Sequence, residues 1–205
     1  AVSASNASFP VSGISDGSYS DTPSENTFFE VGLHFPATAT FDLDVASHPL
    51  GYDLSSIVSF MGWSAQHSDQ VYSVEIKKVG SASFFSLTSV DYRAFTGVTQ
   101  PSYETRVELE DDAGRFLASG VESIRFTFDA PGIVSGSGDT MIREIDVYGA
   151  PSALMITSPV PRQVVQRDGN GQADILIEGS YVNSPDSVEA RAVVLGSGNS
   201  GTDTE

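Results

Sequence analysis

Short apolar runs separated by turn residues are the feature that most constrains the fold of this chain. The runs are rich in Phe, Tyr, Val and Ile. Several alternate between apolar and polar residues, as in Ser123–Phe128, where Ile124, Phe126 and Phe128 share one face. No stretch keeps a helical period over three turns, although residues 113–120 have room for a single turn of helix. The pattern predicts an all-β chain folded as an antiparallel β-sandwich.

The expected strands fall into two groups on either side of the stretch Gly149-Ala150-Pro151-Ser152. Turn and linker composition at this stretch predicts a domain boundary near residue 150. We therefore expect a sandwich over residues 1–150, a small or truncated Ig-like β unit over 151–195, and a flexible tail over 196–205. The first group of strands is Thr27–Phe35, Ala39–Val45, Asp53–Gly62, Val71–Val79, Phe84–Tyr92, Thr105–Leu109, Ser123–Phe128 and Met141–Tyr148, and the second is Leu154–Pro161, Arg162–Arg167, Ala173–Tyr181 and Ser187–Leu195.

The charge of the chain excludes some partners. Acidic residues outnumber basic ones 27 to 10, which gives a formal net charge of −17. Phosphate-backbone binding needs clustered Lys and Arg, and only Lys77 and Lys78 are adjacent. We therefore expect no nucleic-acid partner. The acidic surface is compatible with a saline or extracellular setting and with cation binding.

The compartment is constrained by what the sequence lacks. There is no cysteine, and no apolar run is long enough for a membrane span. The first residue is Ala1, as expected of a mature secreted chain or of an excised piece. We expect a secreted or cell-surface protein.

The segment Met141–Gly149 (MIREIDVYG) places a carboxylate pair in an expected strand. Glu144 and Asp146 share one face because strand side chains alternate, whereas Ile142, Ile145 and Val147 do not alternate regularly. A buried carboxylate is costly unless something pairs with it, and a bound cation is one such partner.

This ending resembles the last strand of discoidin-like domains (coagulation factor 5/8 type C, galactose-binding-like), which often close with an E-I-x-V-Y/F-G run. Gly51–Gly62 followed by Gln70–Ile76 resembles the central strand pair of that family, and Val121–Phe128 its penultimate strand. The resemblance covers roughly residues 9–150 and implies a galactose-binding-like jelly-roll that binds rather than catalyses. Ile156–Tyr181 resembles the strand-rich segment found beside carbohydrate-active catalytic domains in bacterial multidomain proteins.

The resemblance also implies a structural Ca²⁺ between the first loop and the closing strand. Calcium takes six to eight oxygen ligands. Asp16-Gly17-Ser18 corresponds to the opening turn of the family, without the Trp that usually follows it there. The alternative is that Asp16-Gly17 is an ordinary turn and that Glu144 pairs with an Arg. The implied ligands are side chains of Asp16, Ser18, Asp21, Thr27 and Glu144 and the carbonyls of Gly13 and Arg143.

A sugar site is implied in the loops at one end of the sandwich. The only Trp in the chain, Trp63, stands at the root of a polar loop, and an aromatic face can stack on a sugar. The alternatives are that Trp63 belongs to the core and that His67 and Arg93 are solvated loop residues. The candidate ligand residues are Trp63, Gln66, His67, Asp69, Arg93 and Tyr103.

These observations predict a non-catalytic carbohydrate-binding module that binds polysaccharide or oligosaccharide and is tethered to a catalytic domain. One alternative is a structural or adhesive surface domain without a sugar ligand, and another is a β-jelly-roll polysaccharide lyase or hydrolase. The acidic run formed by Glu108, Glu110, Asp111 and Asp112 is interpreted as a strand end and an exposed turn, because catalytic carboxylate pairs must flank a substrate. No G-x-S-x-G, HExxH or P-loop motif is present.

Overall fold

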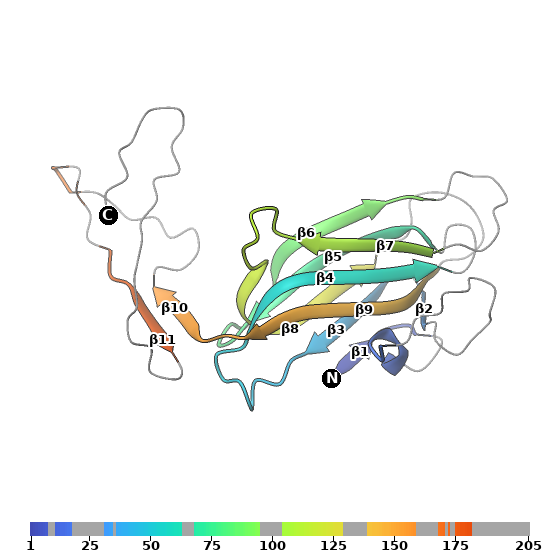
Figure 1. The fold of residues 1–205 in the computed structure, drawn as a ribbon, viewed down its shortest axis with the longest axis horizontal. Coiled ribbons are helices and arrows are strands. Elements are labelled where there is room, and N and C mark those ends of the chain that lie inside the picture. The colour runs from blue at the N-terminus through green and yellow to red at the C-terminus, as the bar shows by residue number, and fades with distance from the viewer. Residues whose placement is uncertain are drawn as a thin grey trace. The chain divides into compact units, whose positions relative to one another are not determined.

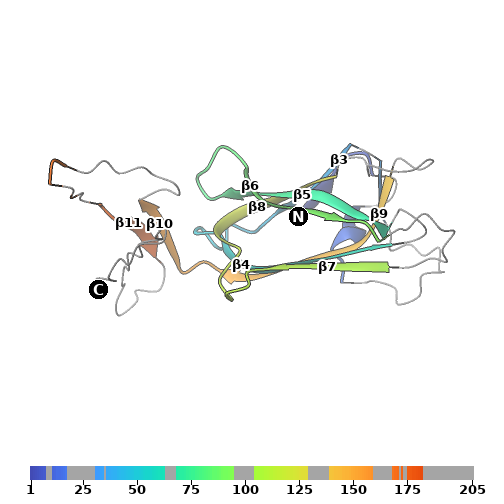
Figure 2. The same ribbon diagram turned by 90° about the horizontal axis from the view of Figure 1, so that it is seen from above.

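Nine strands form one antiparallel sheet that folds over into two layers in the first unit of the computed structural model, Ala1–Met155. One layer contains β1, β3, β8, β5 and β6, and the other contains β7, β4, β9 and β2; Figure 2 shows β5 and β8 on one side and β4 and β7 on the other. The strands are β1 (Val2–Ala4), β2 (Val31–His34), β3 (Ala37–Asp42), β4 (Tyr52–Gly62), β5 (Gln70–Lys78), β6 (Phe85–Tyr92), β7 (Glu104–Glu110), β8 (Ala118–Phe128) and β9 (Asp139–Pro151).

The structure describes residues 1–7, 11–17, 31–34, 36–62, 68–94, 104–128, 139–158, 168–170, 172 and 175–181. Within these ranges the one helical element is the 3₁₀ helix η1 (Val11–Ile14), which is far too short to span a membrane. All strand pairs of the sheet are antiparallel. The prediction of an antiparallel β-sandwich is therefore confirmed.

Alternating side chains of the two layers meet in one apolar core. On β8, Ile124, Phe126 and Phe128 are fully buried, as the sequence predicted. Phe126 packs edge-on against Phe41 of β3, with ring centroids 5.6 Å apart, and lies 5.7 Å from the ring of Tyr72 on β5. Aromatic burial of this kind supplies much of the stability of a sandwich.

The irregular spacing of Ile142 and Ile145 has a structural cause. In β9 the register against β4 shifts by one residue between Glu144, which faces Phe60, and Ile142, which faces Met61. Arg143 is the extra residue of this β-bulge, so both isoleucines reach the core although they stand three positions apart. Glu144 and Asp146 are consecutive alternate positions of β9, and the prediction that they share a face is confirmed.

Two predictions for the first unit were wrong. The expected strand Ala39–Val45 ends early: β3 stops at Asp42, and the amide of Val45 turns back to the carbonyl of Leu43 at 3.0 Å, although Leu43 still packs against the core. No helical turn forms over residues 113–120, since β8 begins at Ala118 and Gly120 has a φ of 68°. The first part of the expected strand Thr27–Phe35, residues 27–30, lies outside the described residues, as does Phe35.

The second unit is Ile156–Glu205. A two-stranded sheet pairs β10 (Leu154–Ser158), which begins just before this unit, with β11 (Glu178–Tyr181) inside it. Residues 175–177, which were expected to belong to a longer strand, precede β11 and are exposed. The expected strands Arg162–Arg167 and Ser187–Leu195 and the tail 196–205 lie outside the described residues. The limits of the two predicted domains, and the Ig-like character of the second, stay predictions.

Candidate functional site

One end of the sandwich gathers the strand ends that flank the predicted ligand residues (Figure 1). Gly62 at the end of β4 pairs with Glu104 at the start of β7, and Gln70 at the start of β5 pairs with Tyr92 at the end of β6. Phe128, the last residue of β8, pairs with Tyr72 near the start of β5. The segments 63–67, 95–103 and 129–138 therefore begin and end at the same edge of the molecule. We call this edge the loop end.

A buried polar network fixes these strand ends to one another. Ser59 of β4 donates a hydrogen bond to Oε1 of Gln70 at 2.6 Å, and the Nε2 group of Gln70 donates to Thr105 Oγ1 at 3.1 Å. The Thr105 hydroxyl donates to the carbonyl of Ser68 at 2.5 Å. The Tyr72 hydroxyl lies 2.8 Å from Ser59 Oγ, and burial raises the pKa of this phenol to about 12, although the Ser59 contact opposes the shift. The network joins β4, β5 and β7 just beneath the loop end.

Arg93 is the predicted ligand residue that the structure places most clearly. It follows β6, and its Nε donates to Asp91 Oδ1 at 2.6 Å while Nη2 donates to Oδ2 at 3.3 Å. These bonds to Asp91, and a smaller contribution from the Asp69 carboxylate, raise the pKa of Arg93. About a third of the arginine side chain, 30%, stays exposed. Its guanidinium is therefore oriented and partly open to solvent.

The other predicted ligand residues are divided between two groups. Asp69 immediately precedes β5 and is only 8% exposed, so its carboxylate acts mainly beneath the surface. Trp63, Gln66, His67 and Tyr103 lie outside the described residues, so the alternative of a core position for Trp63 stays open.

The side chain of Glu144 lies on the face of β9 opposite to the core, where the segment that follows η1 covers it. It is 1% exposed, and its Oε1 accepts a hydrogen bond from the amide of Gly17 at 3.2 Å. Its Oε2 is buried and has no hydrogen-bond donor among the described residues. Burial raises the pKa of Glu144 to about 7, and the carboxylates of Asp146 and Asp16 add to the shift, whereas the amides of Gly17 and Asp16 oppose it.

Part of the expected metal site lies near Glu144. A buried carboxylate oxygen without a donor, beside the like charge of Asp16, is the kind of group that Ca²⁺ would satisfy. Gly17 has a φ of 78°, and residues 15–17 form a bend. Gly13 of η1, which comes shortly before Asp16 in the sequence, is buried. Ser18, Asp21 and Thr27 lie outside the described residues, and within the described ranges no group of three acidic, His or Cys side chains gathers as a metal site.

The arginine next to Glu144 pairs with a different acid. Arg143 is fully buried at the β9 bulge, and its Nε lies 2.8 Å from Oε1 of Glu104 at the start of β7. The same nitrogen donates to the carbonyl of Gly62 at 3.3 Å. Arg143 thus ties together the two strand ends from which the segments 63–67 and 95–103 depart.

Comparison with known proteins gives matches among solved structures alone. No protein-family model matches the chain, and no curated protein matches it. The family 32 module of C. perfringens NanJ, solved with galactose, has a TM-score of 0.47 and 14% identity over 72% of this chain and 91% of that chain. A truncated AlyQ with CBM32 and alginate lyase domains gives 0.46 and 16% over 75% of this chain and 33% of that one, so the chain spans about a third of it. An F5/8 type C domain of a Bacteroides fragilis protein gives 0.40 and 12% over 74% and 93%.

The chain is thus similar to structures of family 32 and F5/8 type C modules, which are the discoidin-like domains that its sequence resembles.

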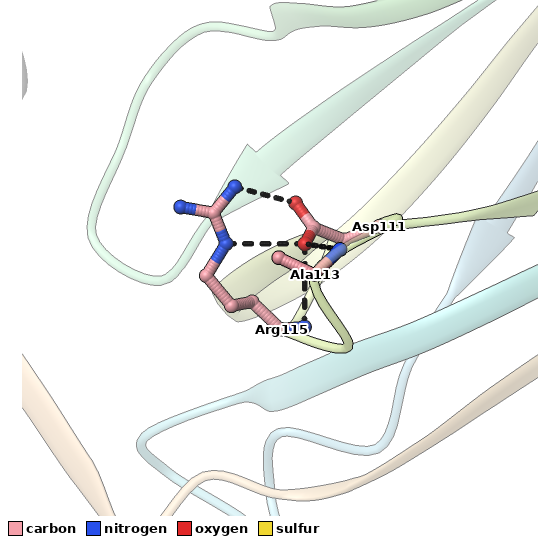
Figure 3. A network of polar contacts seen from close by, with 3 residues as sticks. All are labelled: Asp111, Ala113 and Arg115. Atoms are coloured by element: carbon pink, nitrogen blue, oxygen red, sulfur yellow. Dashed lines mark hydrogen bonds and ion pairs between the residues drawn. The ribbon is translucent and has the colours of Figure 1, made fainter.

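The acidic run of Glu108, Glu110, Asp111 and Asp112 forms the end of β7 and the turn after it, as predicted. Asp111 closes a turn by accepting hydrogen bonds from the amide of Ala113 at 3.0 Å and from Nε of Arg115 at 3.1 Å (Figure 3). The bond from Arg115 is the main reason why the pKa of Asp111 is lowered. Glu108 pairs with Arg106 at 2.8 Å. This turn joins the ends of β7 and β8 that lie away from the loop end.

Sequence reasoning missed the side chains that organise the loop end, namely Ser59, Gln70, Glu104 and Thr105. Polar residues at strand ends usually face solvent, so their types and spacing give no signal of burial. The one usable signal was the run Gln70–Ile76, in which Tyr72, Val74 and Ile76 alternate and Gln70 occupies the next position of the same buried face.

Proposed function

We propose that this chain is a non-catalytic carbohydrate-binding module whose ligand surface is the loop end. The observation that carries the proposal is the Arg93 guanidinium, which Asp91 holds in a fixed plane at the edge where the ligand-candidate segments depart. A guanidinium has five N–H donors, of which the Asp91 pair uses two. The remaining donors suit adjacent sugar hydroxyls, since rigid donors lose little entropy on binding.

The affinity of such a site is modest. A stacking aromatic and a few hydroxyl hydrogen bonds, each with a net contribution of about 1 kcal/mol, correspond to dissociation constants of roughly 10 μM to 1 mM. The buried network beneath the loop end supports this site because it fixes the strand ends before the ligand arrives. Trp63, Gln66, His67 and Tyr103 are proposed as the residues that complete the surface.

We further propose that a structural Ca²⁺ stabilises this part of the molecule. Glu144 and Asp16 would supply carboxylate oxygens, Gly13 and Arg143 would supply carbonyls, and Ser18, Asp21 and Thr27 would complete the shell. The support is the buried Glu144 Oε2, for which the described residues offer no donor. When bound, the ion supplies the positive charge that this carboxylate lacks and holds the turn after η1 against β9.

The biological setting follows from the proposed role. Weak binding to a repetitive polymer is useful to a tethered enzyme, because it raises the effective concentration of the catalytic partner near its substrate. We propose that the module is attached to a carbohydrate-active enzyme and acts outside the cell, in a secreted or cell-surface bacterial protein. The formal charge of −17 favours neutral over polyanionic polymers.

Affinity electrophoresis and calorimetry test the proposal. The probes are galactose, which is the sugar in the NanJ complex, and neutral galactan, glucan and mannan. Arg93→Ala should weaken binding about tenfold or more and leave the melting temperature nearly unchanged. Arg115→Ala, at the far end of the sandwich, is the matched control and should bind normally. If no probe is bound, the proposal fails, and a structural or adhesive role without a sugar ligand takes its place.

A further inference from the structure

The outer face of the β3–β8–β5 layer contains a hollow with a volume of about 310 Å³. It is lined by charged and hydroxyl side chains of three neighbouring strands, by the ring of Phe84 and by two aliphatic residues, Leu43 and Val45. Both residues follow the end of β3 and are partly buried, and Leu43 also packs against the core. The hollow therefore has a polar base and apolar walls.

The sheet register explains why the hollow forms here. Asp42 of β3 and Lys77 of β5 both pair with Ser123 of β8, so the three residues make one row across the sheet. Their neighbours Phe41, Ile76 and Ile124 are buried in the core, and alternation turns the row outward. A small serine between two longer side chains leaves space above it.

The polar groups of the hollow are held in place by one another. The Ser123 hydroxyl donates to Asp42 Oδ1 at 2.9 Å. Lys77 Nζ lies 2.6 Å from Glu122 Oε1, and these two side chains are 30% and 20% exposed. The carboxylate of Asp42 has two oxygens and the ammonium of Lys77 has three N–H donors, so each has capacity beyond its described bond. The hollow thus presents preorganised acceptors and donors side by side.

Its aromatic wall is also fixed. The guanidinium of Arg125 lies 4.1 Å from the ring centroid of Phe84, and the same guanidinium donates to Glu75 Oε2 at 2.9 Å. Phe84 precedes β6, so the ring is placed from the edge of the layer over the row next to Ser123. Cation–π contact and the ion pair together restrict its motion.

Beyond the neighbouring row of Thr40, Arg125 and Glu75, the same face presents a row of hydroxyls. Thr38 of β3 pairs with Thr127 of β8, Thr127 pairs with Ser73 of β5, and Ser73 pairs with Ser89 of β6. These four positions are partly or fully exposed. A ligand that extends from the hollow along β8, past the Arg125–Glu75 pair, meets short side chains that both donate and accept hydrogen bonds.

From this arrangement we infer that the hollow around Asp42, Ser123, Lys77 and Phe84 is a second carbohydrate subsite, which binds a neutral saccharide chain laid across β3, β8 and β5. Alternating donors and acceptors beside an aromatic wall match a ligand with many hydroxyls and C–H faces. Two carboxylates against one ammonium disfavour a uronic acid. The inference rests on the proposed function, but it concerns a different surface from the loop end.

Amide shifts in nuclear magnetic resonance spectra of the full ¹⁵N-labelled chain separate the two surfaces. The probes are galactotetraose, cellotetraose and mannotetraose, titrated one at a time. Binding in the hollow is expected to shift the amides of Thr40, Ser123 and Lys77, whereas binding at the loop end shifts those of Asp69 and Arg93. Thr40→Tyr fills the hollow with a residue that strands tolerate well and should abolish the first set of shifts.

A charge variant gives a graded readout. Asp42→Asn keeps an acceptor for Ser123 but removes the carboxylate charge, and it should weaken binding at the hollow roughly three- to tenfold. Glu110→Gln removes one exposed carboxylate from β7 in the other layer and should change nothing. Both variants replace exposed residues and should fold normally.

Each outcome decides between the two surfaces. Shifts at Thr40, Ser123 and Lys77 that Thr40→Tyr removes support the second subsite, whether or not the loop end also responds. Shifts confined to Asp69 and Arg93, or shifts at the hollow that persist in Thr40→Tyr, overturn the second subsite and leave the proposed function in place. Shifts confined to the hollow support the subsite and move the proposed ligand surface away from the loop end. No shift with any probe overturns both.

Discussion

The two ends of the sandwich are built by different means. At the end away from the loop end, which we call the turn end, the links 43–51, 79–84 and 111–117 are closed largely by backbone hydrogen bonds and short-range side-chain contacts. At the loop end, long-range contacts between buried polar side chains hold the strand ends together. The turn end thus combines local turns with close approaches of the backbone, whereas the loop end depends on contacts between buried side chains.

Gly51 and Gly149 illustrate the turn end. Gly51 has a φ of 77°, and a Cβ there would lie 2.7 Å from the carbonyl oxygen of Val121, so only glycine suits the position. Gly149 lets β9 approach the carbonyl of Asp53 more closely than a Cβ would permit. Asp53 in turn accepts a hydrogen bond from Ser152 at 2.5 Å. Small residues therefore make this end tight.

The loop end, by contrast, is held together by large buried polar side chains. Arg143, Glu144 and Gln70 are large polar residues that are almost completely buried, a costly placement that only good pairing can support. Their positions coincide with the candidate ligand and metal surfaces. The comparison suggests that the loop end gives up stability for a fixed arrangement of binding segments, and the following predictions test that difference.

The largest effect is expected when the buried ion pair at the loop end is broken. Arg143→Ala leaves the Glu104 carboxylate without its 2.8 Å partner and creates a cavity at the β9 bulge. We expect the free energy of unfolding to fall by about 3–5 kcal/mol, measured by chemical denaturation. Arg115→Ala, at an arginine whose side chain is 74% exposed at the turn end, is the control and should cost far less. Equal losses in the two variants would contradict the proposed difference between the ends.

The next effect concerns the pH dependence of stability in the presence of a chelator. The pKa of Glu144 rises from 4.5 to about 7 on folding. Between these values the folded state keeps a proton that the unfolded state has released, so stability is lost as the pH rises through this window. The loss is up to about 3 kcal/mol. Glu144→Gln should remove this part of the pH dependence and make the metal-free protein more stable than wild type at pH 8.

With calcium bound, the wild-type protein should be more stable at pH 8 than Glu144→Gln. In the wild-type protein Ca²⁺ should raise the melting temperature at pH 8, because it binds the folded state alone, and Glu144→Gln should show no such rise. Asp146→Asn removes a neighbouring charge that raises the pKa of Glu144, and it should shift the pH window downward without abolishing the calcium response. If melting curves with calcium and with chelator coincide, the metal proposal is wrong.

The same contrast explains what the sequence could predict. Period-two alternation placed Ile124, Phe126 and Phe128 in the core and put Glu144 and Asp146 on one face, because both follow from strand geometry alone. The bulge at Arg143 and the burial of Gln70 depend on the neighbouring strand, and alternation in one strand contains no information about its partners. The alternating pattern of Ala39–Val45 continued past Asp42, where the backbone turns away, so it predicted a strand that was too long.

An intermediate loss is expected from the neutral polar network. Gln70→Ala removes one buried hydrogen-bond partner each from Ser59 and Thr105, and we expect a cost of about 2–3 kcal/mol by chemical denaturation. A double-mutant cycle with Thr105→Val checks the assignment. If the network acts as one unit, the two losses should fall short of additivity by at least about 0.5 kcal/mol. Strict additivity would show that Gln70 and Thr105 act independently and that the loop end lacks the proposed cooperative support.

The smallest effect is expected at the turn end, in the contacts drawn in Figure 3. Asp111→Ala removes an acceptor for the amide of Ala113 and for the Arg115 side chain, but these groups can bond to water instead. The melting temperature should therefore fall less than in Arg143→Ala or Gln70→Ala, and sugar binding should be unchanged. Asp111→Asn keeps an acceptor for the turn and should fall between wild type and Asp111→Ala. A loss of sugar binding in Asp111→Ala with the fold intact would mean that the turn end takes part in recognition, and the functional division between the two ends would then fail.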